Sequence, residues 1–276
     1  MKNQKGFIQI PLLIAIIISA VVLVVTLYAV QSNKERSIER RQDKRVADTE
    51  LSAADVAREW KDRVAEVVCV WTYEDRTGRV LNQKLKGSAI LVNMSVYGGV
   101  TAVTNKHVII DDRGNQAKFC VVGVYGKGSR TAFNVTNTFH PGPDEDYGFI
   151  SLRATTSVEF DGVLQLVSST DEGFFDNVTS DRLRVCTNEP DLGDKVLILG
   201  YPTIGTNLGI TATEGIVSGI EEDHYVTSAK IDYGNSGGAA ILLKDNCYLG
   251  IPTYAINVGG FESLGRILKG TLIFTN

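Results

Sequence analysis

The sequence predicts an all-β domain that begins near residue 66, after an apolar segment and a charged stalk. From that residue onward, short β-branched runs alternate with turns of Gly, Asn and Asp, as is typical of all-β domains. Residues 10–30 carry no charge, whereas residues 31–50 are dense in Arg, Lys, Glu and Asp. We therefore predict an anchor at 1–30, a stalk at 31–54 and a folded domain at 55–276.

The apolar segment is long enough to span a membrane. Its 21 residues run from Ile10 to Val30, and a helix rises about 1.5 Å per residue across a hydrocarbon core of about 30 Å. A cleaved signal peptide is the alternative, but its apolar core is usually shorter, and 27–29 makes a poor cleavage site. We therefore predict an uncleaved single-pass anchor.

The basic residues on either side of the apolar segment bear on the orientation of this anchor. Two lysines precede the span and six basic residues follow it, Lys34, Arg36, Arg40, Arg41, Lys44 and Arg45. The positive-inside rule would then place the domain in the cytoplasm, but long domains cross membranes largely regardless of loop charge. Four cysteines favour an oxidising compartment. We expect the domain to be extracytoplasmic.

A short helix is predicted where the domain begins. Ser52-Ala-Ala-Asp55 has the pattern of a helix start, and Val56, Trp60, Val64 and Val67 recur at helical spacing. We expect this face to pack onto the first half of the β domain. Trp60 and Trp71 are then packing residues.

Composition excludes several classes of partner. The net charge is −4, with 43% hydrophobic and 22% charged residues, an ordinary globular balance. No basic excess suggests nucleic acid, and no CxxC or His/Cys spacing suggests a metal. We expect no cofactor.

The most informative motif is Gly234-Asn235-Ser236-Gly237-Gly238. It fits the Gly-x-Ser-x-Gly turn that exposes a serine hydroxyl, although a plain tight turn is the alternative. All three histidines precede Ser236, which excludes a lipase-like order, and no acid motif lies upstream of His107 as a subtilisin-like order requires. His, then Asp, then Ser remains, and this is the chymotrypsin order.

His107 is the best candidate for the base and Asp146 for the acid. His107 ends a β-branched run, and an imidazole titrates near neutral pH. Asp146 opens an apolar run, so its carboxylate can accept from the imidazole N–H and orient the ring. His140 and His224 have the sequence context of solvated loops. The pattern predicts a triad of His107, Asp146 and Ser236.

These residues resemble the trypsin-like serine proteases, and among them the HtrA/Deg-like branch. The similar segments, in chain order, are Thr104-Asn-Lys-His-Val108, Asp146-Tyr-Gly-Phe-Ile-Ser-Leu152, Gly193-Asp-Lys-Val196, Leu199-Gly-Tyr-Pro202, Thr213-Glu-Gly-Ile-Val-Ser218, Ala229-Lys-Ile-Asp-Tyr-Gly-Asn-Ser-Gly-Gly238 and Leu249-Gly-Ile-Pro-Thr253. The resemblance covers about residues 55–270.

The resemblance implies two six-stranded antiparallel β-barrels, about 64–160 and 185–274, with the triad at their seam. It also implies an oxyanion hole formed by the backbone N–H groups of Gly234 and Ser236. No PDZ domain is expected after residue 276. Asn235 stands where digestive trypsins have an Asp, so activation by insertion of a new N-terminus is not expected.

Cysteine pairing follows from this division into barrels. Cys69 and Cys120 fall in the first implied barrel, and Cys186 and Cys247 fall in the second. One disulfide per barrel is the simplest of three possible pairings. Free buried thiols remain the alternative.

The substrate preference rests on three further residues. Lys230 lies six residues before Ser236, at the position that lines the primary pocket of digestive enzymes, and the resemblance places Gly250 and Ile251 on a substrate-facing strand. An inward Lys230 would favour an acidic side chain before the cut. Lysine usually extends into solvent, so we favour the small aliphatic preference of HtrA-like relatives.

The sequence therefore predicts a membrane-anchored serine endopeptidase that acts on polypeptides, with a role in extracytoplasmic protein quality control. Two alternatives remain. One is a catalytically silent module that binds extended or unfolded peptides, and the other is an esterase that uses the same triad.

Overall fold

The structure is a computed structural model that describes residues 51–94, 99–124, 130–134, 145–152, 158–160, 163–165, 182–203, 209–256 and 264–274, with Tyr28, Gln31 and Ser32. Residues 51–276 form one compact unit, separate from 1–50. The predicted anchor at 10–30, except Tyr28, lies outside the described residues, as do His140 and most of the stalk. Within the described part of the chain, no helix has the length and apolarity that a membrane span requires.

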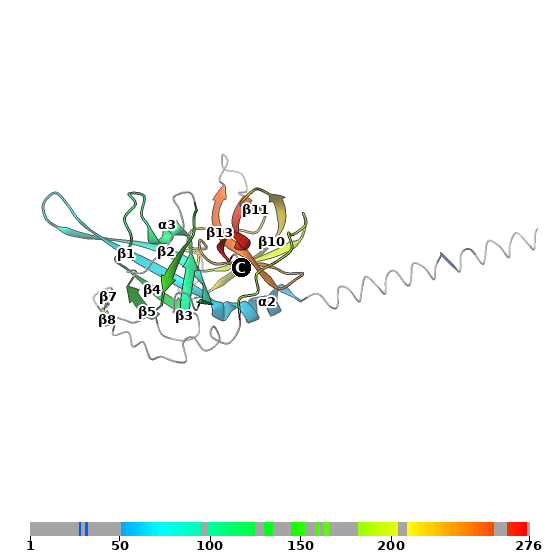
Figure 1. The fold of residues 1–276 in the computed structure, drawn as a ribbon, viewed down its shortest axis with the longest axis horizontal. Coiled ribbons are helices and arrows are strands. Elements are labelled where there is room, and N and C mark those ends of the chain that lie inside the picture. The colour runs from blue at the N-terminus through cyan, green and yellow to red at the C-terminus, as the bar shows by residue number, and fades with distance from the viewer. Residues whose placement is uncertain are drawn as a thin grey trace, which may run out of the picture. The chain divides into compact units, whose positions relative to one another are not determined.

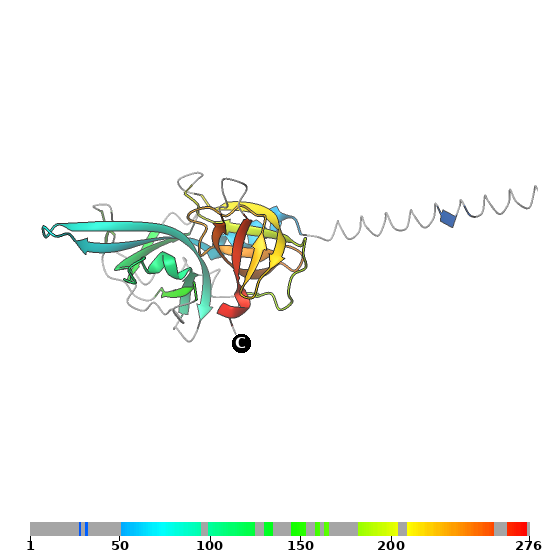
Figure 2. The same cartoon turned by 90° about the horizontal axis from the view of Figure 1, so that it is seen from above.

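The first half of the compact unit is an antiparallel sheet with the strand order β5-β4-β1-β2-β3-β6. Its strands are β1 Val64–Glu74, β2 Val80–Met94, β3 Gly99–Thr104, β4 Phe119–Val124, β5 Arg130–Asn134 and β6 Gly148–Ser151. A separate pair, β7 Val158–Phe160 and β8 Val163–Gln165, forms a two-stranded sheet. β1 and β2 extend beyond the rest of the sheet as a long hairpin (Figures 1 and 2).

The second half is a closed barrel with the order β10-β11-β14-β13-β12-β9. Its strands are β9 Lys195–Gly200, β10 Thr211–Ile220, β11 His224–Thr227, β12 Ala239–Leu242, β13 Cys247–Ile256 and β14 Leu264–Lys269, followed by the short helix α5 Gly270–Ile273. The predicted second six-stranded barrel is confirmed. The first half has the six strands predicted, and the described residues do not show it closed into a barrel. Closure requires the edge strands to pair, and no pairing joins β5 to β6 among the described residues.

Alternation along the strands builds three apolar clusters, and β9 shows how. Successive side chains of a strand point to opposite faces. Val196 and Ile198 therefore belong to the barrel interior, whereas Leu197 and Leu199 join a cluster shared with the first sheet. That shared cluster includes Ile90 of β2, and it forms the seam between the two halves. The seam is thus a hydrophobic core in its own right, and it fixes the sheet against the barrel.

The predicted helix start is confirmed, but the helix is shorter than its apolar spacing indicated. α2 spans Ala53–Trp60, and the Ser52 side chain caps it by accepting from the Asp55 N–H. Val64 and Val67 instead lie in β1, after the 3-10 turn η1 Lys61–Arg63. The β-branched run that begins at Val64 favours a strand, and its three-residue spacing matched a helix by coincidence.

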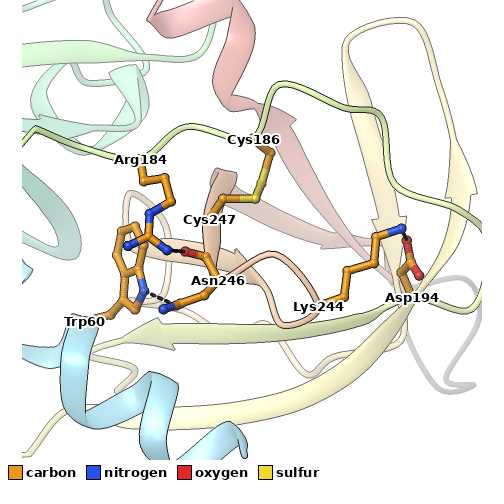
Figure 3. The surroundings of a disulfide bond; sticks show 7 residues. All are labelled: Trp60, Arg184, Cys186, Asp194, Lys244, Asn246 and Cys247. Atoms are coloured by element: carbon orange, nitrogen blue, oxygen red, sulfur yellow. Dashed lines mark hydrogen bonds and ion pairs between the residues drawn. A yellow bond between two sulfur atoms is a disulfide. The ribbon is translucent and has the colours of Figure 1, made fainter. Parts of the chain in front are cut away.

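α2 packs at the seam and not onto the first half alone. The Trp60 ring stacks on Tyr248 of β13, with ring centroids 6.5 Å apart. Its indole N–H donates to the Asn246 Oδ1 at 2.8 Å, and the Asn246 Nδ2 donates to Glu59 at 2.7 Å. Figure 3 shows this contact beside a disulfide of the barrel. Trp60 and Trp71 are both buried, which confirms their packing role.

The disulfide prediction is also confirmed. Cys69 and Cys120 are bonded across directly paired positions of β1 and β4. Cys186 and Cys247 are bonded between the segment before β9 and the start of β13. Each half therefore carries one covalent cross-link, and no cysteine is left free.

Candidate active site

Strand register brings His107 and Asp146 together across 39 residues of sequence. β3 and β6 pair with Thr104 opposite Gly148. The residues that follow Thr104 and those that precede Gly148 are therefore neighbours. His107 lies in the short helix α3 Lys106–Ile109, and the side chains of Val108 and Ile109 are buried in the first sheet. This anchoring leaves the His107 side chain 45% exposed.

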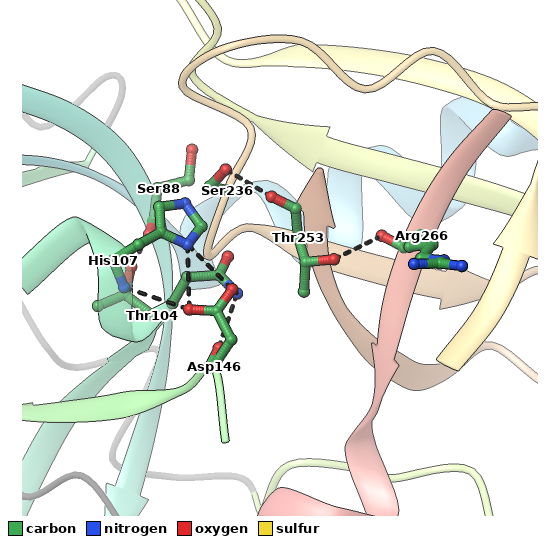
Figure 4. A network of polar contacts seen from close by, with 8 residues as sticks. Ser88, Thr104, His107, Asp146, Ser236, Thr253 and Arg266 are labelled. Atoms are coloured by element: carbon green, nitrogen blue, oxygen red, sulfur yellow. Dashed lines mark hydrogen bonds and ion pairs between the residues drawn. The ribbon is translucent and has the colours of Figure 1, made fainter. Parts of the chain in front are cut away.

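The carboxylate of Asp146 is held by several donors. The His107 Nδ1 lies 3.0 Å from Oδ1 and 2.9 Å from Oδ2, and the His107 backbone N–H donates to Oδ1 at 3.2 Å. The Asn105 Nδ2 donates to Oδ2 at 3.0 Å and to the Asp146 backbone carbonyl at 2.8 Å. Figure 4 shows the carboxylate below the imidazole. This arrangement orients the ring with Nδ1 toward the acid.

Ser236 lies in a turn whose glycines no other residue can replace without strain. Gly234 and Gly237 have φ values of +97° and +90°, which disfavour residues with a Cβ. A Cβ on Gly234 would lie 2.4 Å from the Tyr201 carbonyl oxygen, and one on Gly237 would lie 2.0 Å from the Ser88 carbonyl oxygen. The turn is thus pressed against both halves of the domain.

The Ser236 hydroxyl donates to the backbone carbonyl of Thr253, in β13, at 2.9 Å (Figure 4). Its turn nevertheless adjoins the segment that carries His107. A Cβ on Gly87 would lie 2.7 Å from the Val108 side chain and 3.2 Å from the Ser236 carbonyl. The structure therefore places Ser236 in the neighbourhood of the His107–Asp146 pair, with its hydroxyl bonded to β13.

Ser88 joins the two halves at this turn, although no sequence motif predicted this role. Its Oγ donates to the Gly234 carbonyl at 2.6 Å and accepts from the Tyr201 N–H at 2.8 Å. Its backbone N–H donates to the Ser236 carbonyl at 2.7 Å, and its own carbonyl accepts from Thr104 Oγ1 at 2.7 Å. Ser88 is fully buried. The only signal in the sequence is the pair of small residues at 87–88 before an apolar run.

Asn105 and Thr253 lie within the segments that resemble trypsin-like proteases, but the sequence predicted no role for either. The Asn105 side chain donates to the Asp146 carboxylate, and the Thr253 backbone carbonyl accepts from the Ser236 hydroxyl. Both are fully buried polar residues. Burial of a polar side chain is favourable only when it is hydrogen-bonded, so such residues indicate a defined polar network.

The backbone N–H groups proposed for the oxyanion hole have no acceptor among the described residues. The neighbouring amides are bonded: the Asn235 N–H donates to the Asp232 carbonyl, and the Gly237 N–H donates to the Pro252 carbonyl. The N–H groups of Gly234 and Ser236 form none with the described part of the chain. Gly234 is buried, and buried amides are rarely left unpaired. Such a pair beside a serine can bind a developing negative charge.

The three predicted substrate-binding residues differ in their surroundings. Lys230 is exposed, whereas its neighbour Ile231 is buried in the barrel. Ile251 is fully buried, and its side chain packs in the seam core. Gly250 is enclosed as well, since a Cβ there would lie 1.9 Å from the Leu268 carbonyl oxygen.

His224 lies opposite Leu268 of β14, in β11 of the barrel. Desolvation, followed by the Arg266 guanidinium nearby, lowers the pKa of His224. It is therefore a half-buried strand residue and not the solvated loop residue that its sequence context indicated. Across the described residues, no group of three or more His, Cys, Asp or Glu side chains is arranged to hold a metal ion.

Comparisons with known proteins identify relatives of this fold. Two solved structures of the HtrA-type protease AlgW with a decapeptide match 80% of this chain. The first structure has a TM-score of 0.57 and 19% identity, and the match covers 64% of its chain. The second has a TM-score of 0.54 and 21% identity, and the match covers 65% of its chain. The present chain thus spans slightly less than two thirds of the AlgW chains. The inactive form of the Rv3671c protease has a TM-score of 0.50 and 17% identity, over 78% of this chain and 87% of its own.

At these identities the structural likeness shows the fold alone. A search of curated proteins gave no match. A family model described as a trypsin-like peptidase domain matches residues 87–251, which is more than half of the chain. The matched segment contains Ser88, His107, Asp146 and Ser236. The chain therefore belongs to the family of trypsin-like peptidase domains.

Proposed function

We propose that the protein is a serine endopeptidase in which Ser236 is the nucleophile, His107 the general base and Asp146 the acid that orients it. The observation that carries the proposal is the contact of the His107 Nδ1 with both oxygens of Asp146, at 3.0 and 2.9 Å. A carboxylate that accepts from Nδ1–H leaves Nε2 as the basic nitrogen. The base then has the tautomer that proton abstraction from a serine requires.

The reaction proceeds through an acyl-enzyme. Ser236 Oγ transfers its proton to the His107 Nε2 and attacks the carbonyl carbon of the scissile bond. The oxyanion that forms is bound by the N–H groups of Gly234 and Ser236. His107 then protonates the leaving amine, and water hydrolyses the ester by the same route. Before attack, the Ser236 hydroxyl must leave the Thr253 carbonyl, 2.9 Å away, and turn to the imidazole.

The hydrogen bond to Thr253 also favours a second candidate function. A nucleophile bonded to a backbone carbonyl does not donate to its base, and a domain that kept this arrangement would bind extended peptides without cutting them. Labelling of the full-length protein with a fluorophosphonate separates the two functions. A peptidase is labelled, and the label is lost in Ser236→Ala. A folded protein that remains unlabelled favours the peptide-binding module.

We further propose that extended or unfolded polypeptides are the substrates, in a quality-control role outside the cytoplasm. The AlgW structures contain a decapeptide, which supports a polypeptide substrate in this family. The exposed Lys230 side chain supports a small aliphatic residue before the cut. Peptides with Val, Ala, Glu or Arg at that position test this choice, and a dominant preference for Glu would overturn it.

The location of the protein is likewise a proposal. Residues 10–30 serve as a single-pass anchor, and the two disulfides support an oxidising compartment. Extraction of membranes at alkaline pH should leave the protein in the pellet. External protease should degrade the domain in intact cells or spheroplasts. A domain that remained protected would contradict this orientation.

A further inference from the structure

The peptide group between Tyr233 and Gly234 decides where the Gly234 N–H points. In a trans peptide the carbonyl oxygen and the N–H lie on opposite sides of the chain, and none of the described peptide bonds is cis. Any group that holds the Tyr233 carbonyl therefore also fixes the direction of the Gly234 N–H. Rotation of this one peptide would remove a donor from the oxyanion hole.

Thr203 holds that carbonyl with two donors. Its backbone N–H donates to the Tyr233 oxygen at 2.7 Å, and its Oγ1 donates to the same oxygen at 3.1 Å. Thr203 follows β9 and is 30 residues away in sequence, so it does not belong to the serine turn itself. The two bonds restrain the peptide from a different loop of the barrel.

The next peptide of the turn is restrained independently. The Gly234 carbonyl accepts from Ser88 Oγ, and the Asn235 N–H donates to the Asp232 carbonyl at 2.9 Å. The Gly234 N–H itself has no acceptor in the described part of the chain. A donor that is fixed in direction and left unpaired meets the requirement for electrostatic preorganisation.

We infer that Thr203 is a positioning residue for the oxyanion hole, acting through the Tyr233 carbonyl on the Gly234 N–H. The inference rests on the proposed function, since the hole matters only if Ser236 attacks a carbonyl. Thr203 touches no reacting atom. It holds the peptide in the orientation that presents the donor to the transition state.

The test compares Thr203→Val with Thr203→Ser in the full chain. Valine keeps the size of threonine and the backbone N–H but removes the hydroxyl, whereas serine retains the hydroxyl. Complete loss of an oxyanion donor lowers kcat by about 100-fold or more. Loss of one of two restraints on that donor should cost less, and we expect Thr203→Val to lower kcat about 5-fold with KM unchanged. Thr203→Ser should restore kcat to within about 2-fold of the parent.

The inhibition constant of a peptide boronate is a second measurement, and it would not change if Thr203 had a purely structural role. Its tetrahedral adduct occupies the oxyanion hole, so its inhibition constant should rise in Thr203→Val by about the factor that kcat loses. Thr211→Val is the matched control, because it removes a similar bond, from Thr211 Oγ1 to the Gly200 carbonyl at 3.2 Å. The inference is overturned if kcat and boronate affinity are unchanged in Thr203→Val, if only KM rises, or if serine behaves as valine does.

Failure of the proposed function is recognised separately, by a parent protein that cleaves no peptide. In that case the Gly234 amide still tests the inference. Labelling tyrosine carbonyl carbons with 13C and glycine nitrogens with 15N selects the four Tyr-Gly pairs, at 97–98, 125–126, 147–148 and 233–234. The Gly234 resonance should shift in Thr203→Val and stay in place in Thr203→Ser and Thr211→Val. An unmoved resonance in all three variants would refute the role of Thr203.

Discussion

His107 and Asp146 are positioned within the first sheet alone, whereas Ser236 is positioned by contacts that join this sheet to the barrel. The pairing of β3 with β6 and the donors from Asn105 and His107 define the acid and base. The serine turn instead depends on Ser88, which belongs to the other half of the domain. The proposed acid–base pair is therefore a local feature, whereas the position of the proposed nucleophile depends on the interface between the halves.

This difference predicts distinct responses to mutation. A change in the acid–base pair should alter chemistry and leave the fold intact. A change at the serine turn should affect stability and chemistry together, because the same bonds join the halves and shape the turn. Separate measurements of kcat, KM and unfolding free energy distinguish the two responses.

The largest effect on chemistry is expected for Asp146→Asn. An amide in place of the carboxylate favours the wrong imidazole tautomer, and kcat should fall on the order of 10⁴-fold with KM nearly unchanged. Steady-state kinetics with a peptide substrate provide the measurement. The unfolding free energy should change little. A variant that retained more than a tenth of the parental kcat would show that Asp146 does not orient the base.

The largest effect on stability is expected for Gly237→Ala. The new Cβ would lie 2.0 Å from the Ser88 carbonyl oxygen and 2.2 Å from Thr104 Oγ1, at a φ of +90°. We expect destabilisation of at least about 3 kcal/mol, together with loss of activity.

Gly78→Ala is the matched control for this change. Gly78 has a similar φ of +80°, but its nearest neighbour is a Glu74 oxygen at 3.5 Å. It should lose only about 1 kcal/mol, the cost of the backbone conformation. Chemical denaturation measures both variants. Equal losses would mean that the turn is not pressed against the first sheet.

An intermediate effect is expected for Ser88→Ala. The substitution removes the two hydrogen bonds of the Ser88 hydroxyl, from the Tyr201 N–H and to the Gly234 carbonyl. An unsatisfied buried group costs about 1–3 kcal/mol, and we expect kcat to fall as well because the turn is released. Ser218→Ala removes an exposed hydroxyl bonded only at 3.5 Å, and it should change stability by less than about 0.5 kcal/mol. A Ser88→Ala variant as stable and active as the parent would refute the joining role.

The smallest effect is expected at Asp111, in the first half of the domain, where the contribution to stability depends on pH. Desolvation opposes ionisation of Asp111, but hydrogen bonds from Tyr73, Asn115 and the Arg113 amide outweigh it and lower its pKa from 3.8 to about 2. The lower folded pKa stabilises the protein above pH 3.8, and this contribution is lost as pH falls from 3.8 to about 2.

Tyr73→Phe removes one donor, so it should raise the pKa of Asp111 and weaken this contribution. Urea unfolding at pH 6 and at pH 3 should show a smaller difference in midpoint for the variant than for the parent. An identical difference would show that the Tyr73 hydroxyl does not act on Asp111.

Local sequence patterns were sufficient for the features that depend on neighbouring residues. The helix start at Ser52, the strand-rich domain and the glycine turn at Ser236 are all encoded within a few positions. The cysteine pairing followed once each half was recognised as a separate unit.

Features that depend on tertiary contacts were not predictable in this way. Ser88 bonds to a carbonyl 146 residues away, so nothing near it in sequence reveals its role. The run that begins at Val64 has both the apolar spacing of a helix and the β-branched composition of a strand. In the structure it pairs with β2 and β4 and is therefore a strand. Ile251 lies two residues before Thr253 in β13. Its side chain is buried in the seam core, which the sequence did not reveal.

We propose that Ser236, activated by His107, forms a covalent acyl intermediate. The most direct measurement is acid quenching of the full-length protein during turnover of an activated ester, followed by peptide mapping with mass spectrometry. We expect one acyl group per chain on the peptide that contains Ser236, and none in Asp146→Asn at the same time point. An acyl group on another residue, or no acyl group while the ester is consumed, would contradict it.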